Sequence, residues 1–116
     1  MIILNLICCC CLVATRNSAG FKEYGNASYY SDEFQGKKTA SGEKYNKWDY
    51  TCAHKRLPFG TKLKVTNLEN NKNVIVRVND RGPFIKNRIV DLSFAAAQEI
   101  AMINKGVVRV KIEVIE

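Results

Sequence analysis

Two stretches of alternating residues, joined by a short polar turn, constrain the fold of this chain more than any other feature. In "TKLKVTNL" (61–68) and "NVIVRVND" (73–80) apolar residues recur at every second position, and Asn67 continues the apolar face of the first stretch. A period of two is typical of a strand with one buried face. The recurring apolar residues are Leu63, Val65, Val74, Val76 and Val78. Because "ENNKN" between the stretches consists of turn-forming residues, we predict a β-hairpin from Thr61 to Asn79.

Three further segments are predicted strands. They are "YGNASYY" (24–30), "NRIVDLS" (87–93) and the closing "GVVRVKIEVIE" (106–116), which alternates apolar and charged residues. The region between the first of them and residue 51 reads as long loops, which is where small domains often place function. Several short strands with a single helix favour a mainly β fold that closes into a small barrel, since closure removes exposed strand edges.

The single predicted helix follows the strand at 87–93. Ser93 can cap its amino end, and "FAAAQEIAM" (94–102) supplies strong helix formers. Asn104 and Gly106 are expected to stop it.

The amino-terminal run, residues 1–14, is apolar and contains Cys8 to Cys11. It is shorter than the roughly 20 apolar residues that a membrane-spanning helix needs, and has the length of the core of an export signal. We therefore assign residues 1–19 to an irregular export segment of signal-peptide or lipoprotein type, in which one of these cysteines could carry a lipid. Residues 20–116 are expected to form one domain.

The charge of the chain is strongly basic. It has 18 Lys and Arg against 11 Asp and Glu, a formal net charge of +7. Such a charge suits an anionic partner, for example an anionic wall polymer. The basic residues are scattered singly or in pairs and match no nucleic-acid-binding signature, so we predict no nucleic-acid partner. A solvated Lys-rich surface explains the charge equally well.

The only histidine, His54, lies in "TCAHKRLPFGT" (51–61), two residues after Cys52. It could act in catalysis, bind a metal together with Cys52, or pack without chemistry, and spacing alone favours packing. Structural zinc normally takes four Cys or His ligands, and residues 20–116 offer no others, so we predict no metal and no cofactor. Cys52 is interpreted as a small apolar residue rather than a nucleophile, because side chains two positions apart on a strand project in parallel.

A second polar segment, "VNDRGPF" (78–84), follows directly on a predicted strand. Asp80 lies at the strand end, the usual place for a side chain that points into a cleft. Together with His54 and Arg81 it would provide a proton-transfer group, a hydrogen-bonding partner and a cation, as glycoside cleavage requires. Glu43 in "TASGEKY" is a second carboxylate on a loop. The alternative is a turn in which Asp80 accepts bonds from backbone amides and Arg81 forms a salt bridge, and spacing alone favours this alternative.

Other polar and aromatic residues have competing interpretations. Asp91, beside the start of the helix, is expected to be a capping or packing carboxylate. Tyr29, Tyr30, Tyr45 and Trp48 could stack on sugar rings, or anchor the core and loops.

Three segments taken together are more specific than their spacings. "ASYYSDEFQGKKTASGEKYN", "TCAHKRLPFGTKLKVTNLENNKNVIVRVNDRGPF" and "RIVDLSFAAAQEI" resemble, in this order, the rare lipoprotein A-like family of bacterial proteins. The resemblance runs from about Gly25 to the carboxyl terminus. It implies a six-stranded double-psi β-barrel with one short α-helix.

The resemblance also implies lytic transglycosylase activity in cell-wall remodelling and daughter-cell separation. Such enzymes cleave the bond between N-acetylmuramic acid and N-acetylglucosamine without water, on glycan strands lacking stem peptides, and leave a 1,6-anhydro end. Asp80 matches the family's catalytic aspartate, His54 its important histidine and Glu43 the glutamate of its "TASGE" motif. In the expected mechanism Asp80 protonates the glycosidic oxygen, and its carboxylate, or His54, then takes the proton of the sugar 6-hydroxyl.

The expected substrate-binding residues are Glu43, Tyr30, Thr39, Lys55 and Arg81. The expected partner is the peptidoglycan glycan strand, met by an exported monomer in the periplasm or cell envelope, with membrane attachment through a lipidated amino-terminal cysteine as a further option. Two alternatives stay open. One is a module that binds or loosens wall polysaccharide without cleaving it, as related expansins do; the other is a structural lipoprotein at septa.

Overall fold

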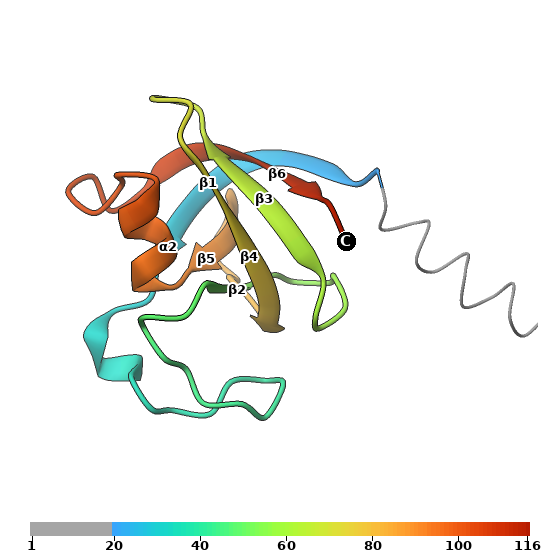
Figure 1. Ribbon diagram of the computed structural model, residues 1–116, viewed down its shortest axis with the longest axis vertical. Coiled ribbons are helices and arrows are strands. Elements are labelled where there is room, and N and C mark those ends of the chain that lie inside the picture. The colour runs from blue at the N-terminus through green and yellow to red at the C-terminus, as the bar shows by residue number, and fades with distance from the viewer. Residues whose placement is uncertain (1–19) are drawn as a thin grey trace, which may run out of the picture.

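The structure is a computed structural model that describes residues 20–116, and its centre is a closed barrel of six strands (Figure 1). The strands are β1 (Lys22–Tyr29), β2 (Thr51–Ala53), β3 (Lys62–Asn67), β4 (Asn73–Asp80), β5 (Arg88–Leu92) and β6 (Val108–Val114). A 3-10 helix, η1 (Asp32–Phe34), and an α-helix, α2 (Phe94–Glu99), complete the described elements. The predicted mainly β barrel with one short α-helix is confirmed, whereas the predicted export segment, residues 1–19, lies outside the described residues.

The strands are ordered β1–β5–β2–β4–β3–β6 around the barrel, so most neighbours in space are distant in sequence. β1 pairs with β5 and β2 pairs with β4 in parallel, and the other four neighbouring pairs are antiparallel. A parallel pair cannot be joined by a tight hairpin, so the chain must cross the barrel between its members. These crossings bring β1, β5, β2 and β4 side by side, and the candidate site lies across those four strands.

The interior of the barrel is filled by the alternating apolar residues of its strands. Fully buried side chains come from all six strands and include Ala27, Cys52, Leu63, Val65, Val76, Val78, Val90, Leu92, Val110 and Ile112. The predicted hairpin is confirmed as β3 and β4, and Asn67 is buried with the apolar residues of β3. Its amide is satisfied there, because Nδ2 donates to the Ile100 carbonyl and Oδ1 accepts from the Glu69 N–H.

Helix α2 is shorter than predicted. Ser93 caps it as expected, accepting a hydrogen bond from the Ala96 N–H, but the helix ends at Glu99 rather than at residue 102. The reason is a Schellman turn, in which Ala101 adopts a φ of 56° and the Met102 N–H bonds to the Ala97 carbonyl. Glycine usually occupies the left-handed position of this turn, so an alanine there gave no stop signal.

β2 is a strand of three residues that the alternation pattern did not predict. All three residues, Thr51 to Ala53, are buried, and β2 pairs with β4 on one edge and with β5 on the other. Cys52 packs in the barrel interior, as expected of a small apolar residue. Burial also raises the pKa of its thiol, which leaves it a poor nucleophile and a poor metal ligand.

A long loop, residues 30–50, connects β1 to β2 and lies along one end of the barrel beside β2 and the end of β4 (Figure 1). Its inner side is anchored by Tyr45, whose hydroxyl accepts a hydrogen bond from the Phe94 N–H at the start of α2. Tyr45 is 2% exposed, and its ring stacks on that of Tyr30 with centroids 4.5 Å apart. Two roles were considered for Tyr45, stacking on a sugar ring and anchoring the loop, and its burial and hydrogen bond support the second.

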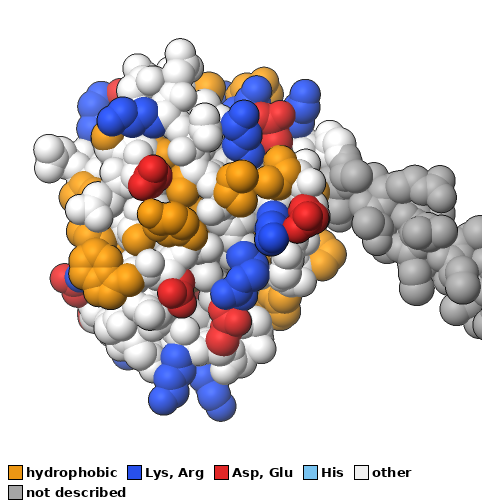
Figure 2. Space-filling model, viewed as in Figure 1, with side chains coloured by type: hydrophobic (Ala, Val, Ile, Leu, Met, Phe, Trp, Pro, Cys, Tyr) orange, Lys and Arg blue, Asp and Glu red, His pale blue; other side chains and the backbone are white. Residues whose placement is uncertain are grey.

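Charged side chains of both signs are interspersed on the face shown in Figure 2, with hydrophobic side chains between them. On this face the basic residues do not form one continuous patch, in keeping with the scattered pattern of the sequence. Within residues 20–116, no helix has the length and apolar character needed to cross a membrane.

Candidate functional site

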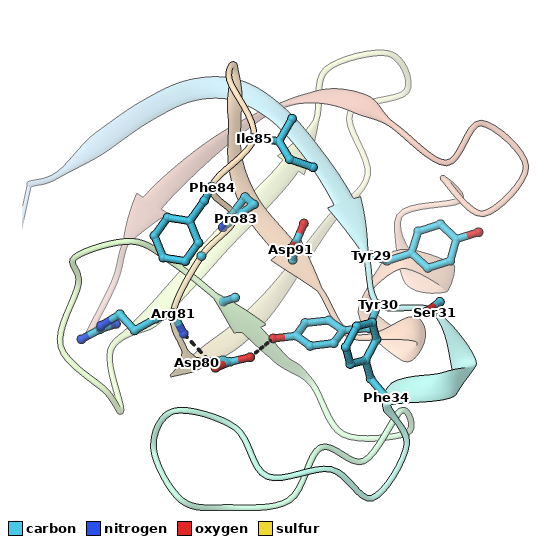
Figure 3. A pocket seen from close by; sticks show the side chains of 12 residues that line it. Tyr29, Tyr30, Ser31, Phe34, Asp80, Arg81, Pro83, Phe84, Ile85 and Asp91 are labelled. Carbon is cyan, nitrogen blue, oxygen red and sulfur yellow. Dashed lines mark hydrogen bonds between the residues drawn. The ribbon is translucent and has the colours of Figure 1, made fainter.

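A pocket of about 400 Å³ opens on the outer surface of the barrel where β1, β5, β2 and β4 lie side by side (Figure 3). Two aspartates and several aromatic side chains meet in it. Its lining residues are Tyr29, Tyr30, Ser31, Phe34, Ala53, Asp80, Arg81, Gly82, Pro83, Phe84, Ile85 and Asp91. Three of the residues predicted to form the site, Tyr30, Asp80 and Arg81, are therefore brought together here.

Asp80 ends β4, and its carboxylate is fixed from two sides. Oδ1 accepts two hydrogen bonds, from the Ala40 N–H at 2.8 Å and from the Arg81 N–H at 2.9 Å. Oδ2 accepts a hydrogen bond from the Tyr30 hydroxyl at 2.5 Å (Figure 3). The backbone bonds expected of a turn are present, yet they leave Oδ2 directed toward the pocket. Asp80 is thus held in one orientation while one oxygen can exchange a proton.

Tyr30 is the residue that joins Asp80 to the aromatic side of the pocket. Its ring lies between Tyr45, on which it stacks, and Phe34, which it meets edge-on at 5.8 Å. Burial, followed by the hydrogen bond to Asp80, raises the pKa of the Tyr30 phenol. Tyr30 therefore remains protonated, and a hydrogen-bond donor to Asp80, at neutral pH.

Thr39 and Glu43 shape the loop beside Asp80, and neither belongs to the pocket lining. Thr39 closes a tight turn, donating from both its N–H and its hydroxyl to the Glu43 carbonyl. The Glu43 carboxylate bonds to Asn79 at 2.6 Å and to the Arg77 guanidinium at 2.9 Å. The Asn79 bond is the main reason that the pKa of Glu43 is lowered. The turn places the Ala40 N–H against Asp80, so both residues support the site from outside.

Arg81 and Lys55 differ in how firmly they are held. The Arg81 guanidinium donates to the carbonyl groups of His54 and Leu57, at 3.2 and 2.8 Å, and lies 4.1 Å from the centre of the Phe59 ring. The salt bridge considered for Arg81 is not formed with any residue of the described range, 20–116. Lys55 is exposed and lies outside the pocket lining.

His54 is buried, with 2% of its surface exposed, and does not line the pocket. Its Nδ1 accepts hydrogen bonds from the N–H groups of Arg56 and Leu57, at 3.1 and 3.2 Å, and its Nε2 lies 3.1 Å from Glu23 Oε1. Because Nδ1 is an acceptor, the neutral ring carries its proton on Nε2 and donates it to Glu23. Burial lowers the pKa of His54, and Glu23 only partly opposes this. The structure does not bring the His54 ring to the pocket that holds Asp80.

What His54 does position is the backbone around Asp80. The His54 N–H bonds to the Asp80 carbonyl at 3.1 Å, and the His54 carbonyl accepts from Arg81. The loop that follows, residues 54–57, is folded back onto Nδ1. His54 therefore helps to position the backbone next to Asp80.

For Asp91 the sequence predicted a capping or packing role and no place in the site. Asp91 does not cap α2, since Ser93 does so, and its carboxylate lines the pocket. Burial raises the pKa of Asp91, and a hydrogen bond from the Ser28 hydroxyl partly opposes the rise. A signal was present in the sequence, because Asp91 interrupts the apolar run of Ile89, Val90 and Leu92. An acidic residue inside an apolar run of a strand is costly to bury and indicates a function.

No group of three or more His, Cys, Asp or Glu residues in the part of the chain that the structure describes is arranged to hold a metal ion. Of the remaining aromatic residues considered for sugar stacking, Tyr29 borders the pocket and Trp48 lies outside its lining. The Tyr29 hydroxyl donates to the Ile103 carbonyl, which turns its tip away from the pocket. Trp48 is 62% exposed and packs edge-on against Phe94.

A closed six-stranded barrel with two parallel strand pairs, and an acidic pocket across them, defines a double-psi β-barrel protein. The family model described as lytic transglycolase matches residues 22–112. The chain belongs to this family, in its RlpA-like branch. It is 52% identical over 102 residues to the endolytic peptidoglycan transglycosylase RlpA of Pasteurella multocida, covering 88% of this chain and 35% of that protein. It is 59% identical over 91 residues to the Campylobacter jejuni protein of the same name, covering 78% and 33%.

Solved structures confirm the fold alone. A Streptomyces papain inhibitor superposes with a TM-score of 0.69 at 23% identity, covering 84% of this chain and 97% of the inhibitor. The expansin of Clavibacter michiganensis superposes with a TM-score of 0.64 at 21% identity, covering 83% and 51%. The chain spans about a third of the length of the curated relatives just named.

Proposed function

We propose that this protein is an endolytic lytic transglycosylase that cleaves peptidoglycan glycan strands between N-acetylmuramic acid and N-acetylglucosamine. The observation that carries the proposal is the Asp80 carboxylate, fixed at Oδ1 by two backbone N–H groups and presenting Oδ2 to an open pocket. A carboxylic acid that is fixed in one orientation and faces a cleft of this size can protonate a glycosidic oxygen. The names of the RlpA relatives support the same activity.

In the proposed mechanism Asp80 acts first as an acid and then as a base. Because both N–H groups occupy Oδ1, the transferable proton sits on Oδ2. Oδ2 gives this proton to the glycosidic oxygen, and the bond from that oxygen to C1 of the muramic acid breaks with its electron pair on the oxygen. The 6-hydroxyl of the same sugar then attacks C1, and its proton returns to Oδ2. The product is a 1,6-anhydro end, and no water is consumed.

The other predicted residues take supporting roles in this proposal. Tyr30 donates to Oδ2 and steadies the carboxylate, while Thr39 and Glu43 hold the Ala40 N–H in place. Arg81 and His54 act by positioning the backbone next to Asp80, and we assign to His54 no proton transfer with the substrate.

The rim of the pocket is suited to a sugar chain. Phe84 and Ile85 project from the segment after β4 and are 78% and 59% exposed, opposite Phe34 on the far side of the pocket (Figure 3). Exposed aromatic and aliphatic side chains of this kind pack against the apolar faces of sugar rings. We therefore infer a glycan strand as the partner and the cell envelope as the place of action, with the protein acting as a monomer.

The activity is tested by incubating the purified protein with glycan strands freed of stem peptides in water enriched in ¹⁸O. We expect products with 1,6-anhydro-muramic ends and no incorporated ¹⁸O, identified by mass spectrometry. Reducing ends that carry ¹⁸O would mean hydrolysis instead. Binding of the strands without any new ends would overturn the proposal in favour of a polysaccharide-binding module.

Tyr30→Phe is expected to lower kcat about 10- to 100-fold, because it removes one hydrogen bond to a charged group, worth about 1.5 to 3 kcal/mol. The stacking on Tyr45 is retained, so the thermal midpoint should change little. The measurement is the rate of anhydro-end formation at saturating glycan. A wild-type kcat in this variant would show that the Asp80 orientation does not depend on Tyr30.

A further inference from the structure

Four residues on four neighbouring strands lie in one row across the outer surface of the barrel. Ser28 of β1 is in register with Asp91 of β5, Asp91 with Ala53 of β2, and Ala53 with Asp80 of β4. Directly paired residues project from the same face of a sheet. Ala53, Asp80 and Asp91 all line the pocket, as this register requires.

The centre of this row is left open by the size of Ala53. Asp80 and Asp91 are separated by two strand spacings, about 10 Å between their Cα atoms. Ala53 between them has only a methyl group and is 2% exposed, so it forms a floor and does not fill the space above it. Figure 3 shows Asp91 projecting from β5 near the centre of the pocket, with the Asp80–Tyr30 pair below it in the view. Both carboxylates border the same pocket of about 400 Å³.

The Asp91 carboxylate is held by a single hydrogen bond, which comes from the β1 side of the row. The Ser28 hydroxyl donates to Oδ1, from the side of the row that faces away from Ala53. Among residues 20–116, no salt bridge reaches Asp91 and no donor is bonded to its Oδ2. The Asp91 carboxyl is half-buried and accepts one hydrogen bond, from a neutral hydroxyl, while the charge of Arg88 on the same strand only partly opposes the effect of burial on its pKa. A half-buried carboxylate with no ion-pair partner is a candidate for a functional group.

We propose that Asp91 is a second catalytic residue, whose carboxylate stabilises the positive charge that develops on C1 and the ring oxygen of the cleaved muramic acid. The inference rests on the proposed transglycosylase function. Asp91 gains and loses no proton in the cycle. Asp80 gives a proton to the leaving oxygen and recovers one from the 6-hydroxyl, so atoms and charge balance without a further group. The contribution of Asp91 is electrostatic: its charge is fixed in a partly dry site, where it stabilises the transition state more than the neutral substrate.

Asp91→Asn provides the first test, because it removes the charge and keeps the shape. We expect kcat for anhydro-end formation to fall about 10²-fold, while KM and the thermal midpoint stay near their wild-type values. Asp49→Asn is the matched control, since Asp49 is exposed and lies outside the pocket, and it should retain the wild-type kcat. A wild-type kcat in Asp91→Asn overturns the inference alone. Absence of product from the wild-type protein overturns the proposed function and this inference with it.

Asp91→Ala provides a second test, which separates charge from packing. The truncation leaves room beside the Ser28 hydroxyl for a formate ion. Added formate should restore part of the lost kcat, at least several-fold, in Asp91→Ala and should have no effect in Asp91→Asn, where the space is filled. Suppose that formate changes the kcat of neither variant, and that both variants have the circular dichroism of the wild type. Asp91 would then have a packing role, and the inference would be overturned.

Discussion

Asp80→Asn is expected to lower the rate of anhydro-end formation about 10³-fold or more, the largest effect of any single substitution in this protein. The amide cannot deliver a proton to the glycosidic oxygen or take one from the 6-hydroxyl, so both halves of the reaction lose their acid and base. The fold should survive, because the Asn carbonyl oxygen can still accept from the N–H groups of Ala40 and Arg81. The Asn amide then faces the Tyr30 hydroxyl, which can accept as well as donate.

The loss should lie in kcat, with glycan binding close to that of the wild type. Single-turnover rates and the dissociation constant for denuded strands, measured on the same preparation, separate the two. Asp80→Glu provides a graded comparison, since it keeps the acid and displaces it by one methylene. A wild-type rate in Asp80→Asn would remove Asp80 from the mechanism. A loss of binding equal to the loss of rate would make Asp80 a substrate-binding group only.

The fold was largely predictable because its strands carry a strong local signal. The hairpin of β3 and β4, and the alternation of β6, follow from apolar residues at every second position, and these residues fill the barrel. β2 was not predicted because three residues are too few to show a period. Its identity as a strand depends on β4 and β5, which pair with it from distant parts of the chain. Pairing of this kind is a tertiary effect that no local pattern reports.

The candidate site was predictable in composition but not in arrangement. The end of β4 placed Asp80 at a cleft, as expected from its position after a strand. The role of Asp91 depends on its register with Ala53, which is set by the crossing of the chain, and proximity to the helix start pointed instead to a cap. For His54, sequence spacing could not show that both ring nitrogens bond to groups within the protein and that the ring does not line the pocket.

The buried position of His54 leads to the second large effect, on stability. His54→Phe should lower the free energy of unfolding by about 3 kcal/mol at neutral pH. The phenyl ring keeps most of the volume beside Phe21, but the N–H groups of Arg56 and Leu57 lose their acceptor. The buried Leu57 N–H left unpaired costs about 1 to 3 kcal/mol, and the partly buried Arg56 N–H and the lost bond to Glu23 add to this. Chemical denaturation of both proteins provides the measurement. Glu23→Gln is the control: its amide oxygen still accepts from Nε2, so it should cost less than about 1 kcal/mol.

The difference in free energy of unfolding between the wild type and His54→Phe should depend on pH, and this dependence tests the protonation state assigned to His54. Burial lowers the pKa of His54 in the folded protein below the value near 6.5 that the unfolded chain has. Above about pH 6.5 the ring is neutral in both states and contributes no pH dependence. Below it the unfolded chain binds a proton that the folded protein does not, so the wild type loses stability as the pH falls, until the folded pKa is reached. Phenylalanine does not titrate, so the gap between wild type and His54→Phe should narrow between about pH 6.5 and 5. A gap that widens over this range would mean that His54 is protonated in the fold, which its two backbone N–H donors on Nδ1 do not allow.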